Sequence, residues 1–181
     1  MNKKNIWLVI PTMFMPYLVV VILSIMMFGE NNPFGKINPL GIILLYSLIA
    51  TILNIFWFVR SIIKKGDPIL TAKWAMIIKV VQIPAYIAIF ILGICLMITI
   101  FTIPFVIVLF FIDSLILFLT GLITISSAIN SIRLKQLKIT DIIWVIILQF
   151  VFCADVVATI IYYLKIKKRG IMYEEKSLPK K

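Results

Sequence analysis

A long apolar run constrains the fold of this chain more than any other feature. From Val80 to Ile132, 53 residues include a single side chain that is charged at neutral pH, Asp113. A helix needs about 20 apolar residues to cross the roughly 30 Å hydrocarbon core of a bilayer. The run is therefore long enough for two crossings joined by a tight turn, and it predicts an integral membrane protein.

The composition of the whole chain agrees with a membrane environment. Its 181 residues are 63% hydrophobic and 14% charged, with a mean hydropathy of +1.16, whereas soluble domains are about half apolar and a quarter charged. A net charge of +11 would suggest nucleic acid in a soluble protein. Here the basic residues lie mainly between apolar runs, the pattern that orients helices against an anionic leaflet, so the predicted partner is the lipid bilayer and not nucleic acid.

Apolar segments separated by polar turns predict an all-α integral membrane protein, a bundle of about five transmembrane helices. The predicted segments are residues 6–28, 40–63, 74–101, 105–131 and 141–164. They form one predicted domain, residues 1–170. The polar tail, residues 171–181, is expected to be disordered.

The distribution of basic residues leaves the number of crossings open. The linker after the first segment holds one basic residue, Lys36, and the next linker holds five, so the N-terminus is predicted to be cytoplasmic. Five crossings would put the seven basic residues of the tail outside, against the same rule. Four crossings with a re-entrant fifth segment would keep them inside, and this arrangement is the alternative.

Polar residues follow one face of several segments. In the fourth segment the polar positions are Asp113, Thr120, Thr124, Ser127 and Ser131, which fall within an arc of about 60°. In the second segment they are Ser47, Thr51, Asn54 and Ser61. Such stripes are most often contacts between helices, so they predict the faces that point into the bundle.

Two of the intramembrane residues are carboxylates at a similar predicted depth. Helical rise places Asp113 about 13 Å from the outer end of its helix and Asp155 about 21 Å from the inner end of its own. Two carboxylates at one level should share a proton or hold a cation. They are therefore candidate proton- or cation-binding residues, together with Asn54 and Thr120, and the alternative is that both aspartates are neutral and structural.

A second polar group is predicted at the cytoplasmic end of the third segment, where Lys79, Gln82 and Tyr86 share a face. Lys79 is expected to extend to the membrane surface, as long basic side chains do, and not to pair with either aspartate.

Cysteine and histidine usage argues against a metal site. Cys95 and Cys153 fall near the level of the aspartates, which makes a soft-metal site conceivable. Buried cysteine is more often a small hydrophobe, and histidine is absent, so no metal and no other cofactor is predicted.

Four stretches of the sequence resemble an uncharacterised family of small multi-spanning membrane proteins from Gram-positive, often gut-dwelling, bacteria. They are residues 75–79 (AMIIK), 82–86 (QIPAY), 98–105 (ITIFTIPF) and 146–158 (IILQFVFCADVVA). The resemblance extends over about residues 72–164. It implies a multi-pass protein of the bacterial plasma membrane, and nothing about mechanism.

Two functions follow from these features. One is a small transporter or channel-like protein that uses Asp113 and Asp155 for a proton or a cation. The other is a non-catalytic membrane partner, such as an accessory subunit, an immunity-type protein or a regulator, with a membrane-protein partner or a second copy of the chain bound at its helices. An enzyme is disfavoured because phosphate-loop, nucleophile-elbow and zinc-ligand motifs are missing.

Overall fold

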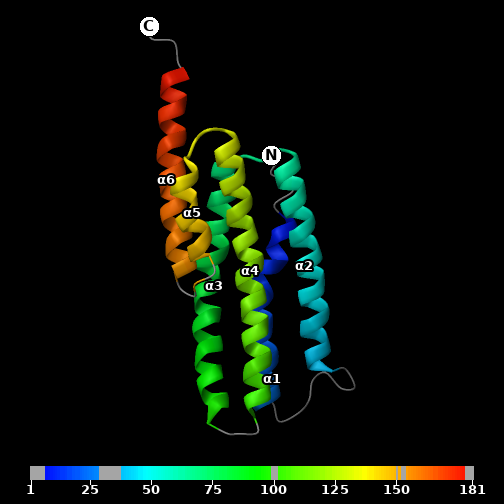
Figure 1. Ribbon diagram of the computed structural model, residues 1–181. Coiled ribbons are helices and arrows are strands. Elements are labelled where there is room, and N and C mark those ends of the chain that lie inside the picture. Colours follow the sequence, from blue (N-terminus) through cyan, green and yellow to red (C-terminus); the bar gives the residue numbers. More distant parts are fainter. Residues whose placement is uncertain (1–6, 29–37, 99–101, 150, 152–153, 178–181) are drawn as a thin grey trace.

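The described residues form six α-helices and no strand in this computed structural model (Figure 1). They are residues 7–28, 38–98, 102–149, 151 and 154–177, the last seven by backbone alone. The helices are α1 (Ile10–Phe28), α2 (Pro39–Ile63), α3 (Pro68–Met97), α4 (Ile103–Arg133), α5 (Ile139–Leu148) and α6 (Ala154–Ser177).

Four helices, α1 to α4, are long and apolar enough to cross a membrane. They run alternately up and down and form the body of the bundle (Figure 1). The start of α3 carries a clear signal. Asp67 accepts hydrogen bonds from the N–H groups of Ile69 and Leu70, at 3.0 and 3.4 Å, and Pro68 is the first residue of the helix. Asp at the N-cap and Pro at the first position are both favoured at a helix start.

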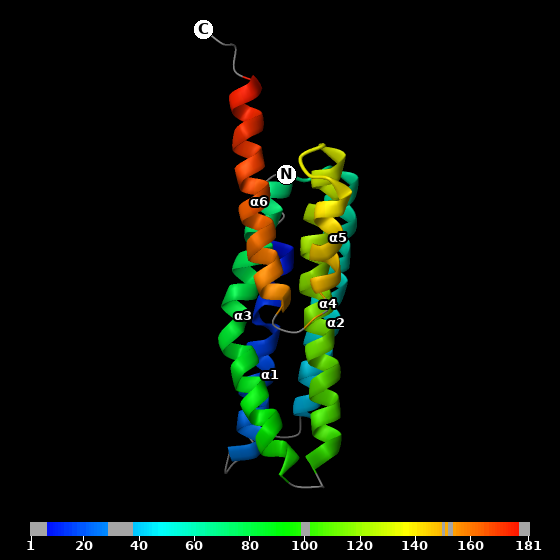
Figure 2. The ribbon, with the colours of Figure 1, turned by 60° about the vertical axis from the view of Figure 1, so that its left-hand side comes forward.

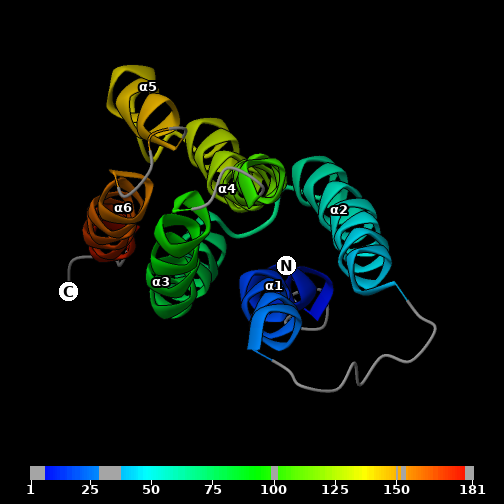
Figure 3. The ribbon, with the colours of Figure 1, turned by 90° about the horizontal axis from the view of Figure 1, so that it is seen from below.

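The segment predicted as a single fifth helix, residues 141–164, differs in the structure. It is divided between α5 and α6, which lie side by side as a hairpin along α3 and α4 (Figure 2). Seen along the bundle axis, this hairpin lies on one side and α2 on the other (Figure 3). Neither Pro nor Gly occurs between Gln149 and Asp155, so contacts with other helices, and not a local helix breaker, account for the break.

Two ion pairs join the arms of this hairpin near its open end. Lys165 Nζ lies 2.9 Å from Asp141 Oδ1, and Arg169 Nη2 lies 3.2 Å from Asp141 Oδ2. In one continuous helix, residues 141 and 165 would be about 36 Å apart. The hairpin brings α6 back to the end of the bundle where α2 ends and α3 begins (Figure 1), which is the geometry of the four-crossing alternative.

The C-terminal segment also differs from the expectation of disorder. The backbone of α6 stays helical to Ser177, so residues 171–177 of the predicted tail continue the helix. Residues 178–181 lie outside the described residues.

Most positions of the predicted polar stripes point inward, and two of them, Thr51 and Asp113, are only partly buried. Asn54, Ser61, Thr120, Thr124, Ser127 and Ser131 are all buried. Several bond across helix interfaces: Ser126 Oγ lies 2.7 Å from Ser61 Oγ, and Ser127 Oγ lies 3.0 Å from the hydroxyl of Tyr162. These bonds join α4 to α2 and α6, the role expected of small polar residues between membrane helices.

Candidate functional site

Lys79 is the centre of the candidate site, contrary to the prediction that it would extend to the surface. Its side chain on α3 is 1% exposed, and its ammonium lies 2.9 Å from Asp155 Oδ2. It also donates a hydrogen bond to Gln149 Oε1. The expectation that Lys79 would pair with neither aspartate is therefore wrong. The physical reason is the hairpin, because its two helix ends give the Lys79 ammonium two acceptors. These acceptors replace the hydrogen bonds that the ammonium would otherwise make with water.

The two partners of Lys79 come from the two helix ends at the hairpin tip. Gln149 is the C-cap of α5, and Asp155 is in the first turn of α6. A helix C-terminus carries partial negative charge and a helix N-terminus partial positive charge. The C-terminus of α5 therefore favours the ammonium, and the N-terminus of α6 favours the carboxylate. Irregular backbone at membrane depth is tolerated only where protein or a water-filled cavity surrounds it.

Thr159 closes this network from within α6. Gln149 Nε2 donates to Thr159 Oγ1 at 3.1 Å, and the Thr159 hydroxyl donates to the backbone carbonyl of Asp155 at 2.7 Å. Gln149, Asp155 and Thr159 are each at most 2% exposed. The amide orientation of Gln149 is thus fixed, with its oxygen toward Lys79.

Asp113 is separate from this ion pair. The sequence predicted that Asp113 and Asp155 would share a proton or hold a cation, but the ion-pair partner of Asp155 is Lys79. Asp113 Oδ1 is buried and makes no hydrogen bond to the described part of the chain. Tyr86 on α3 is near enough to both Asp113 and Asp155 for the charge of each carboxylate to act on its phenol.

The other predicted members of the site have mixed roles. Thr120 is buried, but its hydroxyl bonds to carbonyls of its own helix, at 3.1 Å from Ile116 O and Leu117 O. Gln82 and Tyr86 belong to one cluster, with the Tyr86 hydroxyl 3.5 Å from Gln82 Oε1. Gln82 is buried, and Tyr86 lines the same cavity as Asp155, so this cluster adjoins the ion pair.

Thr12 on α1 joins this cluster, and sequence reasoning missed it. Gln82 Nε2 donates to the Thr12 carbonyl at 2.8 Å, and Asn54 Nδ2 donates to the Thr12 hydroxyl at 3.1 Å. The signal was Pro16: proline has no N–H, so it leaves the carbonyl four residues earlier without its helical partner. That carbonyl is Thr12 O, and Gln82 occupies it.

No metal site is evident in the parts of the chain that the structure covers. No group of three or more Cys, Asp or Glu ligands comes together there. Cys95 is a free, exposed cysteine, and Cys153 lies outside the described residues.

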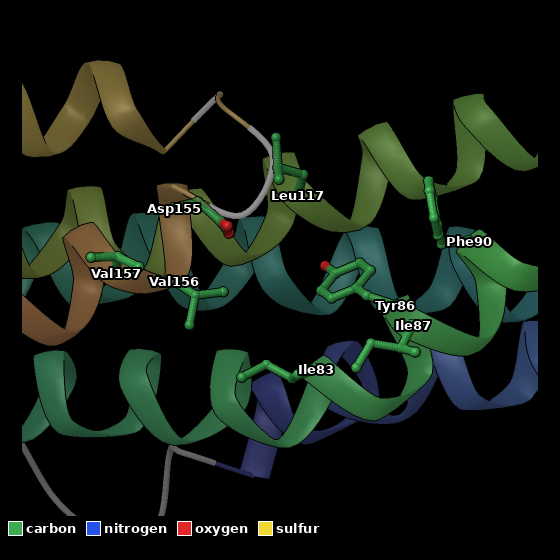
Figure 4. Close-up of a pocket in the computed structure, with 8 residues that line it drawn as sticks. All are labelled: Ile83, Tyr86, Ile87, Phe90, Leu117, Asp155, Val156 and Val157. Carbon is green, nitrogen blue, oxygen red and sulfur yellow. The ribbon is translucent and has the colours of Figure 1, made fainter.

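A cavity of about 460 Å³ opens beside the hairpin tip. Its walls come from α3, α4 and the first turn of α6, and the residues that line it are Ile83, Tyr86, Ile87, Phe90, Leu117, Asp155, Val156 and Val157. Figure 4 shows the oxygen atoms of Asp155 and Tyr86 pointing into the space between these helices. The cavity is therefore apolar except where these two groups face it.

At the open end of the hairpin, the side chain of Asp141 on α5 is partly exposed. The hydrogen bond from Lys165 lowers the pKa of the Asp141 carboxyl below its usual value, and the charge of Arg169 acts in the same direction. The Asp141 carboxylate is therefore ionised over the physiological pH range, and its ion pairs join the two arms.

The structure is an all-helical bundle with four helices long and apolar enough to cross a membrane, and with a buried ion pair at a helix break. No protein-family model, no curated protein and no solved structure matches the chain.

Proposed function

We propose that this protein is a small transporter or channel-like membrane protein, in which the Lys79–Asp155 pair binds and releases a proton or a cation. The observation that carries the proposal is the position of this pair, which is buried at the break of a hairpin and whose Asp155 lines a cavity. Intramembrane ionisable residues are costly and commonly mark ion or proton pathways. Broken helices with their ends at mid-membrane depth are a recurring device in transporters.

The chemistry of the pair supports two states. A proton added to Asp155 removes its negative charge and weakens its hold on Lys79. The ammonium keeps Gln149 and the C-terminal end of α5 as partners. Asp113, whose charge also acts on Tyr86, offers a second carboxylate to which the proton or cation can pass. Binding at the carboxylates would thus change how firmly the hairpin tip is attached to α3.

We propose the bacterial plasma membrane as its location, with the basic end of the bundle in the cytoplasm. The α2–α3 turn, the α4–α5 loop and the second half of α6 all lie at one end (Figure 1). Their basic residues include eight of the 18 Lys and Arg residues of the chain: Lys64, Lys65, Lys135, Lys138, Lys165, Lys167, Lys168 and Arg169. With four crossings, this distribution obeys the positive-inside rule, which the five-crossing prediction could not.

Proton movement in proteoliposomes tests the function. The parent protein should dissipate an imposed pH gradient, read with a pH-sensitive dye in the lumen, faster than protein-free liposomes. Asp155→Asn and Asp113→Asn should both fall to the protein-free rate, because each removes a carboxylate of the pathway. Asp141→Asn is the matched control and should keep the parent rate, because Asp141 is at the open end of the hairpin and does not line the cavity.

Two outcomes would count against the proposal. Parent-like flux in both Asp155→Asn and Asp113→Asn would make the carboxylates structural. Absence of proton or cation movement by the parent would leave the non-catalytic membrane partner as the better explanation.

A further inference from the structure

We infer that the cavity beside the hairpin tip binds an apolar molecule that carries one cationic amine group. This inference names a substrate class for the proposed transporter, and it rests on that proposal. The cavity volume, about 460 Å³, is in the range of pockets that hold drug-sized ligands. Six of its eight lining residues have aliphatic or phenylalanine side chains, so the body of the ligand must be apolar.

The polar edge of the cavity selects the head group. Its two polar lining residues are Asp155 and Tyr86, a carboxylate and a phenol. Both can accept a hydrogen bond, and a protonated amine has only donors to offer. An ionised carboxylate head instead has no donor to offer these two acceptors. The ammonium of Lys79 is already bonded to Asp155 and Gln149.

The charge balance around the cavity points to one positive charge. Asp155 and Lys79 neutralise each other at 2.9 Å. Asp113 remains as a further acidic group; it does not line the cavity, but its charge acts on Tyr86, which does. Its Oδ1 atom is buried and makes no hydrogen bond within the described residues. When Lys79, Asp155 and Asp113 are all ionised, the net charge of the site is one negative charge, which is costly in a membrane interior. A ligand with a single cationic group brings the sum to zero.

Three isosteric probes separate this head-group preference from simple partitioning into lipid. They are 4-phenylbutylamine, 4-phenylbutanol and 4-phenylbutyrate, measured on the full-length protein in phosphatidylcholine nanodiscs, with protein-free nanodiscs as the baseline. The amine should bind saturably and about tenfold or more tightly than the alcohol, as expected for a charge-assisted hydrogen bond. The butyrate should show no saturable binding. Equal binding of amine and alcohol would overturn the inference.

Substitutions inside and outside the cavity wall test whether the amine probe binds in the cavity. Leu117→Trp fills the cavity from α4 and should abolish saturable amine binding. Leu164→Trp is the control, because Leu164 is 58% exposed on α6 and is not a lining residue, and it should bind like the parent. Asp113→Asn should weaken the amine about tenfold and leave the alcohol unchanged. Identical binding by the two tryptophan variants would contradict the inference.

The two proposals can fail separately. Carboxylate-dependent proton flux without saturable amine binding would remove the cavity as an amine site and leave the proposed function. Saturable amine binding without any proton or cation movement would keep the site and remove the transporter.

Discussion

Lys79→Met should destabilise the folded bundle by roughly 3–5 kcal/mol, the usual cost of removing one partner from a buried ion pair. The substitution keeps the length of the side chain but leaves the Asp155 carboxylate buried, with a side-chain exposure of 3%. It also removes the donor to Gln149 Oε1. The free energy of unfolding in mixed detergent micelles measures the effect.

A double variant separates the ion pair from general packing. Lys79→Met combined with Asp155→Leu removes both charges and fills a similar volume, so its stability should return close to that of the parent. If Lys79→Met alone is as stable as the parent, or if the double variant is no better than Lys79→Met, the two residues do not form a buried pair.

Gly121→Leu should cause the second-largest loss in the free energy of unfolding, because Gly121 on α4 faces the hairpin tip. A Cβ atom at Gly121 would lie 3.7 Å from Cβ of Gln149, which is an ordinary contact. Gly121→Ala should therefore be accepted. The extra atoms of leucine would push Gln149 away from Lys79, at a cost of about 1–3 kcal/mol for overpacking.

Gly93 on α3 supplies the control for this series. A Cβ atom there meets no other group within 4 Å, so Gly93→Leu should leave stability unchanged or slightly raise it, since glycine is unfavourable inside a helix. The free energies of unfolding of the three variants test the order. Equal losses for Gly121→Leu and Gly93→Leu would show that the hairpin tip does not pack on α4.

Much of the bundle could be predicted because hydrophobic length is read directly from the sequence. The predicted segment 40–63 matches α2, Pro39–Ile63, and the predicted 105–131 falls within α4, Ile103–Arg133. The inward polar stripes were also predictable, because helical periodicity fixes which residues share a face. The start of α3 could have been set more closely from the Asp67-Pro68 signal, which the prediction of segment 74–101 did not use.

The candidate site was less accessible to sequence reasoning, for a physical reason. Residues 149–155 contain no helix breaker, so apolar length alone favoured one continuous fifth helix. With that helix, Lys79 had no acceptor within reach, and the membrane surface was its only favourable destination. Once the segment folds back, Gln149 and Asp155 lie at the depth of Lys79. The pairing depends on tertiary structure, and the only hint in the sequence was the excess of basic residues in the tail.

The distance between positions 141 and 165 tests the fold-back of the hairpin, on which the site depends, most directly. In a Cys95→Ser, Cys153→Ser background, Asp141→Cys and Lys165→Cys can carry nitroxide spin labels, and electron paramagnetic resonance can measure their separation. We expect strong dipolar broadening from labels close together, because the native side chains are 2.9 Å apart. A narrow distribution near about 36 Å, the spacing within one straight helix, would contradict the hairpin and the site built on it.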